Sequence, residues 1–417
     1  MIDNALRPLK RASRLASRLC PTLLAAALLC GCWDRTEIED RAIVLGISID
    51  KASPEAESEE EPVSHYVKGL GPPASDLIRV GVQLALPGRI PLGPGETGGG
   101  GGGNDPQKTV WVLDVVGHSV NDALMNLQQE LSAKLFFGHL RVIVISEEMA
   151  RFGLENVNDY FHRNSEVRRM AWMMVAKGEA LALMKASPKL ERVPSLYLMT
   201  TLDEGIRMGK FPQDYIGIFW SRKSKLGQEG FLPYVELRKN QTLQIQGLAL
   251  FQGSRMVGAT MPLDIAVYMA LKGNNPGGYS AFVKVKGTEV MTHVTHREAK
   301  TTFEIRDGKP YFKFNTAFEL NLEEKINNEL NIQDPSVIRD IEESQSKGAV
   351  KLITSFLEKT QALGSDVLGL GEYVRAKAPD YWNRNVRTKE RWQRMYKEIE
   401  YEIHIEMKIR RIGMKAE

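Results

Sequence analysis

At 417 residues, with 43% hydrophobic and 26% charged residues, the chain has the composition of a folded protein of two or three domains. Once residues 1–31 are set aside, 50 basic residues face 51 acidic ones, so bulk charge does not indicate a nucleic-acid partner. Of the three cysteines only Cys32 then remains, which excludes a disulfide within the chain.

The first 31 residues have the pattern of a secretory signal peptide. Five basic residues precede the apolar run Leu23–Cys30, which at eight residues is far short of the roughly 20 that span a membrane. Leu29, Cys30 and Gly31 then precede Cys32, in the order of a bacterial lipobox. This pattern predicts cleavage before Cys32 and acylation there, with S-diacylglycerol and N-palmitoyl groups. A plain secretory signal and a buried helix are the alternatives.

Strand and helix patterns alternate in a first domain, which we place at residues 32–205. Short β-branched runs predict strands at 41–50, 76–87, 108–117, 139–146 and 168–178. Helical spacing predicts helices at 118–133 and 179–186, and Ser146 is expected to cap a further helix that begins at Glu147. An acidic stretch after Lys51 and six glycines from Gly98 are expected to be surface inserts.

A small middle α/β domain is predicted at 206–277 and a third domain at 278–417. In the middle domain, Gly253-Ser254 is expected to turn a hairpin that a short helix follows, and 272–280 to be a linker or tight loop. In the third, we expect a hairpin at Asp307-Gly308, a helix that begins at Asp334-Pro335, helical structure around Trp392 and an antiparallel strand over 399–409. The fold class is therefore α+β or mixed α/β, with three domains, each a sheet flanked by helices, the last antiparallel and strand-rich.

Motifs of known enzyme classes are not found in the sequence. Serine-hydrolase elbows, zinc-binding HExxH, paired CxxC and dinucleotide glycine patterns are all missing, so no catalytic residue, metal ligand or cofactor is predicted. His293 and His296 lie three apart in a probable strand, which is expected to send them to opposite faces. His139 is expected to be structural.

One basic stretch, residues 373–397, holds eight basic and two acidic residues with Trp382, Trp392 and Tyr396 among them. One interpretation is an amphipathic helix whose aromatic rings pack on the sheet while its cations stay in water. The other is a surface that faces anionic lipid or an acidic partner. The residues proposed for that surface are Arg375, Lys377, Arg384, Arg387, Arg391 and Arg394.

Several segments, in order along the chain, resemble the Ger(x)C family, the C subunits of spore germinant receptors. The resemblance begins at Cys32 with "CWDRTEIEDRAIVLGISID" and closes with "RWQRMYKEIEYEIHIEMKIRRIG". Between them lie "KLFFGHLRVIVISEEMA", "IQGLALFQGSRMVGA" and "GSDVLGLGEYVRAKAPDYWN". The acidic insert and the polyglycine segment are departures from the family pattern.

The resemblance implies a non-enzymatic lipoprotein on the outer face of the spore inner membrane, with Cys32 as its lipid attachment point. Its implied partners are the integral-membrane A and B subunits of a receptor that responds to small nutrients and triggers germination. Two other classes stay open from the residues alone. They are a lipid-anchored solute-binding protein, which would need two similar lobes, and a cell-envelope hydrolase, which would need a nucleophile or a metal site.

Overall fold

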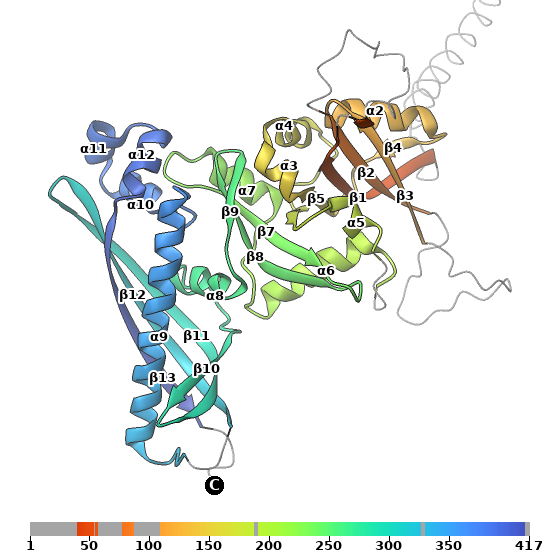
Figure 1. Ribbon diagram of the computed structural model, residues 1–417. Coiled ribbons are helices and arrows are strands. Elements are labelled where there is room, and N and C mark those ends of the chain that lie inside the picture. The colour runs from red at the N-terminus through yellow and green to blue at the C-terminus, as the bar shows by residue number, and fades with distance from the viewer. Residues whose placement is uncertain are drawn as a thin grey trace, which may run out of the picture. The chain divides into compact units, whose positions relative to one another are not determined.

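The computed structural model describes residues 40–53, 55–56, 77–86, 109–186, 191–326 and 330–412. The predicted acylation site, most of the acidic insert and the polyglycine segment lie outside these ranges. From Ile43 onward the described residues form one compact unit, which is built on two β-sheets (Figure 1).

The first sheet has the strand order β3-β2-β1-β5-β6-β7-β8-β9, with the short β4 (Lys134–Phe136) beside β1. Its centre is parallel, and consists of β1 (Arg41–Lys51), β5 (Val142–Ser146), β6 (Trp172–Ala176) and β7 (Phe231–Leu237). Every residue of β5 and β6 is buried, as expected for parallel strands that are covered on both faces. The flanking strands are antiparallel to their neighbours: β2 (Ile78–Ala85), β3 (Val110–Gly117), β8 (Leu243–Gln252) and β9 (Arg255–Ala259).

The strands that we expected in a separate middle domain extend this same sheet. β7 pairs with β6 through Val175 with Tyr234 and Ala176 with Val235, and β8 and β9 follow in order. The hairpin turn between β8 and β9 is confirmed, and Gly253 takes the positive φ of 62° that favours glycine. The first and middle parts of the chain therefore share one core.

Helices pack around this sheet. They are α2 (Val120–Glu130), α3 (Glu147–Phe152), α4 (Glu155–Arg163), α5 (Ala180–Met184), α6 (Pro194–Arg207), α7 (Ile216–Ser224) and α8 (Pro262–Leu271). Ser119 and Ser146 cap α2 and α3 by accepting from the backbone N–H groups of Asp122 and Met149, so the predicted cap at Ser146 is confirmed. The sequence patterns did not reveal α4, α6 and α7.

The second sheet has the order β10-β11-β12-β13. A six-residue strand, β10 (Ser280–Val285), precedes the long hairpin of β11 (Thr288–Arg306) and β12 (Lys309–Lys325), which turns at Asp307-Gly308 as predicted. The last strand, β13 (Glu400–Arg411), lies where we expected a strand, but it runs parallel to β12, so the prediction of an antiparallel strand is wrong. Five helical elements connect β12 to β13 and bring the chain back to the end at which β12 starts. A parallel pair needs such a crossover, whereas an antiparallel pair does not.

A β-bulge in β11 overturns the expected placement of the two histidines. The register shifts between Val294 and His296, so His293 pairs with Asn321 and His296 with Glu319. These two partners are two residues apart on β12 and therefore share a face. Because the extra residue of the bulge changes the parity of the strand, both histidines lie on one face and not on opposite faces.

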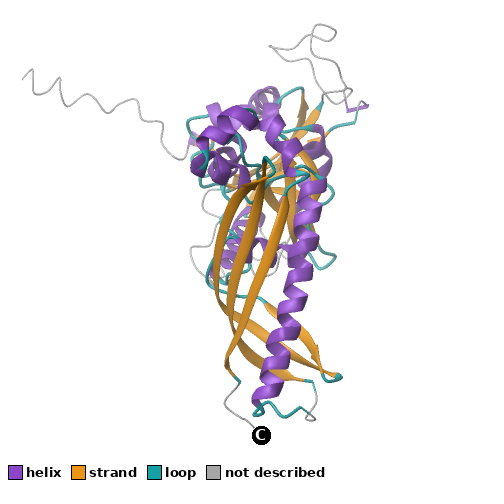
Figure 2. Cartoon of the chain, turned by 90° about the vertical axis from the view of Figure 1, so that its left-hand side faces the viewer, coloured by secondary structure: helices purple, strands orange, loops and turns teal. Residues whose placement is uncertain are grey.

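One long helix, α9 (Pro335–Ala362), runs along the second sheet (Figure 2). Asp334 caps it by accepting from the Ser336 N–H at 2.8 Å, which confirms the predicted start. After α9 come α10 (Leu370–Lys377), α11 (Pro379–Tyr381), the π-helical turn η5 (Trp382–Val386) and α12 (Lys389–Tyr396). Apolar side chains hold α9 near both ends, through Val337 and Ile341 at its start and Phe356 and Leu357 later.

The middle of α9 lies between these two groups of contacts, and a substitution there tests the helix backbone itself. Gly348 lies exposed inside the helix, and a methyl group there would meet nothing within 4 Å. We expect Gly348→Ala to raise the free energy of unfolding by about 1 kcal/mol, because alanine loses less backbone entropy in a helix. Urea denaturation would measure this change, and a loss of stability would show that the turn is packed more tightly than the structure has it.

Residues 272–280, expected to be a linker or tight loop, form a densely packed joint against β11. The Arg297 side chain is 2% exposed, and its Nη2 donates to the carbonyl oxygens of Gly209 at 3.0 Å, Pro276 at 2.7 Å and Gly277. Asn275 exchanges two further hydrogen bonds with the Arg297 backbone. Burial lowers the pKa of Arg297 to about 10, so the guanidinium stays charged at neutral pH.

Candidate interaction surface

The six cations proposed from the sequence are all exposed on the helices that follow α9. We call them the cationic face: Arg375, Lys377, Arg384, Arg387, Arg391 and Arg394. Arg375 forms an ion pair with Glu372 at 2.8 Å, and Arg384 and Arg387 each donate through Nε to a backbone carbonyl four residues earlier. Within the described part of the chain, the other three form no ion pair.

The aromatic residues interleaved with these cations point inward. Trp382, Trp392 and Tyr396 are 3%, 1% and 1% exposed, and they join a core cluster that includes Phe312 and Phe314 of β12. The prediction that the rings pack inward while the cations stay in water is therefore confirmed. This arrangement of rings and cations is formed by several short elements, however, and not by one amphipathic helix.

A buried carboxylate, Asp366, organises the start of α10. One oxygen accepts from the N–H groups of Gly369 and Leu370 at 2.8 and 3.1 Å, and the other accepts from Gly371 N–H at 2.9 Å and Trp392 Nε1 at 3.0 Å. Burial raises the pKa of Asp366 to about 6, although these four donors act against the shift. One side chain thereby ties the first turn of α10 to α12.

The same helices are bound to the loop before β7. Glu372 accepts from Gly227 N–H, and Lys389 pairs with the buried Glu229 at 3.1 Å, so Lys389 does not belong to the exposed set. The backbone N–H of Glu229 also donates to the carbonyl oxygen of Asp366 at 2.9 Å. Sequence reasoning missed these contacts, and their one signal in the sequence is an acidic residue within the apolar, glycine-containing stretch 364–371.

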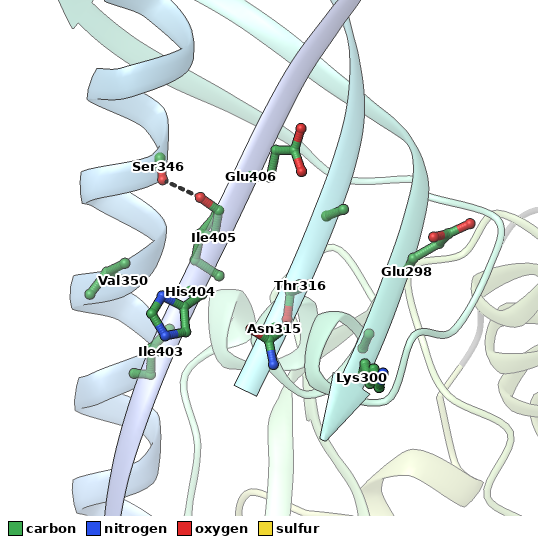
Figure 3. Close-up of a pocket in the computed structure, with 12 residues that line it drawn as sticks. Glu298, Lys300, Asn315, Thr316, Ser346, Val350, Ile403, His404, Ile405 and Glu406 are labelled. Atoms are coloured by element: carbon green, nitrogen blue, oxygen red, sulfur yellow. Dashed lines mark hydrogen bonds between the residues drawn. The ribbon is translucent and has the colours of Figure 1, made fainter. Parts of the chain in front are cut away.

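A hollow of about 610 Å³ lies over β11, β12 and β13 beside α9 (Figure 3). Its lining brings together Glu298, Lys300, Asn315, His404 and Glu406, so both signs of charge are present. The hydroxyl of its α9 serine donates to a backbone carbonyl of β13 at 3.0 Å and is not oriented by a base. The hollow therefore offers polar contacts to a solute but lacks the arrangement of a nucleophilic centre.

Metal ligation finds no support in the described ranges. They hold no group of three or more His, Cys, Asp or Glu side chains that could bind an ion. His293 contacts the Ser280 hydroxyl at 2.9 Å, and His296 lies 3.6 Å from Glu298. His139 packs against the Phe136 ring with 6.0 Å between ring centroids. In the same ranges, no helix has the length and apolar character needed to cross a bilayer.

Comparison with known proteins covers nearly the whole chain. Residues 34–237 match the spore germination protein N-terminal domain, and residues 246–413 match the spore germination B3/GerAC-like C-terminal domain. Spore germination protein KC of Bacillus subtilis is 26% identical over 94% of this chain and 95% of its own length. The putative spore germination protein YfkR of the same organism is 27% identical over 92% of each chain.

The fold is also similar to a solved one. The crystal structure of the GerBC protein matches with a TM-score of 0.54 and 19% identity, over 80% of this chain and 93% of that one. At this identity the match supports the mixed α and β architecture alone. Taken with the two domain matches, which follow each other in order, it means that the chain belongs to the Ger(x)C family of spore germination proteins.

Proposed function

We propose that the protein is the lipid-anchored C subunit of a nutrient germinant receptor and works beside integral-membrane A and B subunits. The observation that carries this proposal is the match of both family domains, which begins two residues after Cys32. The relatives named above are spore germination proteins. The lipobox supplies the means of attachment, so the exported body would be held at the outer face of the spore inner membrane.

In this proposal the subunit acts by binding and not by catalysis. Acylation at Cys32 would confine the folded body to a layer above the bilayer, where membrane-embedded subunits are also confined. Such tethering raises the effective concentration of partners without adding any contact between them. Two or more acyl chains would be required, because one chain holds a protein only marginally.

Replacing Cys32 tests the anchor directly. We expect Cys32→Ala to move nearly all of the protein from the membrane fraction to the soluble fraction and to impair nutrient-triggered germination. The variant lacks the thiol that receives diacylglycerol, while every described residue is unchanged. Membrane fractionation, mass spectrometry of the N-terminus and the germination response of spores would measure the outcome.

Cys30→Ala is the matched control, because it removes a thiol from the same segment and keeps a small residue before the cleavage point. It should leave attachment and germination unchanged. A Cys32→Ala protein that remained in the membrane and supported germination would refute the anchor.

The solute-binding alternative finds less support in the architecture. A protein of that class needs two similar lobes around a cleft, whereas the residues that the structure describes form one large mixed sheet and one four-stranded sheet. Isothermal titration with amino acids and sugars separates the two proposals. A receptor C subunit that does not itself hold the nutrient should give no heat, and saturable binding would favour the alternative.

A further inference from the structure

Arg387 occupies a backbone conformation that arginine rarely adopts. Its φ and ψ are 65° and −47°, and the Thr388 N–H donates to the Val386 carbonyl oxygen at 2.8 Å across it. This is a three-residue turn with positive φ at its centre, a strained arrangement that glycine enters without steric cost. Strain of this kind persists only where the surrounding structure holds the residue in place, and it is found preferentially at functional sites.

A structural role for the Arg387 side chain explains only part of why arginine stands in this strained turn. Its Nε donates to the Asn383 carbonyl oxygen at 2.8 Å and so satisfies one backbone acceptor in η5. The guanidinium has five N–H donors in all, and its terminal nitrogens remain available on an exposed residue. Water would serve the same carbonyl equally well if glycine stood at this position.

Charge is strongly segregated at this surface. Residues 370–397, which span α10 to α12, carry five more basic than acidic residues, while the rest of the chain from Cys32 onward carries six more acidic than basic. A nearly neutral protein therefore presents a concentrated positive field on α10 to α12. Such a field attracts polyanions through long-range electrostatics, even though the net charge of the whole chain gives no sign of it.

The chemistry of the cationic face also indicates which kind of polyanion it fits. Protein–protein interfaces have an apolar centre from which charged residues are depleted. Here the aromatic residues that could supply such a centre are buried, and Tyr373, at 39% exposure, is the one large hydrophobic residue exposed among the described side chains of this segment. A charged face without an apolar centre suits the headgroup layer of a membrane, where contacts are electrostatic and need no shape complementarity.

We propose that the cationic face binds the anionic phospholipid headgroups of a bilayer, with Arg387 held in its strained turn to present its guanidinium to a phosphate. The inference rests on the proposed function, in which Cys32 brings the body to a membrane. Headgroup contact would add an orientation to the anchor, because a lipid chain alone leaves the body free to rotate. Arg387 is suited to this task, since a planar guanidinium forms two parallel hydrogen bonds to a phosphate.

The test uses the mature chain from residue 32 with Cys32→Ser, which cannot be acylated and lacks the basic and apolar segment of residues 1–31, and vesicles of phosphatidylcholine with or without phosphatidylglycerol. Partitioning should be stronger onto the anionic vesicles, and raising the salt from about 0.1 to about 1 M should remove the difference by screening. Adding Arg387→Gly should lower partitioning onto the anionic vesicles about fivefold, the effect of one cation near such a surface. Replacing all six cations by glutamine should abolish the preference.

Lys286→Gly is the matched control. Lys286 is also an exposed cation at a positive φ, of 50°, but it lies in the turn between β10 and β11. Its replacement should leave partitioning unchanged, and Arg387→Lys should keep most of it. Urea denaturation should show that Arg387→Gly is no less stable than the parent, so weaker binding would not reflect unfolding.

Three results would overturn the proposal. They are equal partitioning onto both kinds of vesicle, an anionic preference that survives the glutamine replacements, and binding of polyglutamate in place of phosphatidylglycerol, which would indicate an acidic protein partner. None of them bears on acylation, because every protein compared here lacks the Cys32 thiol. Conversely, failure of the Cys32→Ala experiment would leave a positive vesicle result intact.

Discussion

Asp366→Asn is expected to lower the free energy of unfolding by about 4 kcal/mol. The two oxygens of Asp366 each accept two N–H groups, and the second oxygen serves Gly371 and the Trp392 indole. Asparagine places an NH₂ group where one of these oxygens was, so two buried donors face a third donor and lose their acceptor. Each buried unsatisfied donor costs about 1–3 kcal/mol, which gives the expected total.

Two variants separate this effect from simpler ones. Trp392→Phe removes one of the four donors and leaves the carboxylate in place, so apart from its packing change it should cost less than Asp366→Asn. Asp334→Asn makes the same chemical change at the exposed cap of α9, where asparagine caps as well as aspartate, and should change stability by only a few tenths of a kcal/mol. Urea unfolding followed by tryptophan fluorescence would measure all three. A loss at Asp366→Asn no larger than that at Asp334→Asn would show that the carboxylate does not hold α10.

Asp366→Asn should also disturb the arrangement of the cationic face. Asp366 ties the start of α10 to α12, and these helices carry Arg375 and Arg391. If that link fails, the six cations lose their common support while the charge of each is unchanged. Asp366→Asn is therefore expected to weaken binding to anionic vesicles in the Cys32→Ser chain, although it removes no positive charge.

The sequence predicted most strands because their signals are local. Alternating apolar residues revealed β12 and β13, and the Asp307-Gly308 pair revealed the hairpin turn. The direction of a strand relative to its neighbour has no local signal. The alternation of apolar and polar residues in β13 is the same whether the strand runs parallel or antiparallel to β12. Helices α6 and α7 were missed because both begin without a side-chain N-cap. Val193 and Tyr215 stand at the cap positions, where Ser, Thr, Asp or Asn would have marked the start of a helix.

The features of the candidate surface also divide into those with a signal in the sequence and those without one. The exposure of the six cations and the burial of Trp392 followed from composition, since long charged side chains prefer water and indoles prefer the core. The strained turn at Arg387 and the role of Asp366 depend on backbone geometry that no spacing encodes. The histidine pair failed as a prediction because one inserted residue, invisible in the sequence, changes the parity of β11.

Gly278→Ala is expected to be among the most damaging single-methyl additions in the chain. Gly278 has a φ of 88°, and a Cβ there would collide with the Met208 carbonyl oxygen, a backbone atom that cannot rotate away. The methyl group would have to separate the turn after α6 from β11. We expect a loss of about 2–5 kcal/mol, the sum of the left-handed strain and the overpacking.

Gly287→Ala isolates the first part of that cost, the left-handed strain. Gly287 has nearly the same φ, 85°, but a Cβ there would meet nothing within 4 Å. Its replacement should therefore cost only the conformational strain, about 1–2 kcal/mol. The difference between the two variants measures how tightly the joint is packed. It should be large, because Arg297 gathers the Gly209 and Pro276 carbonyls around one charge and fixes the spacing that an added methyl would have to open. Equal losses at the two glycines would mean that the joint yields easily and that the two sheets are free to move against each other.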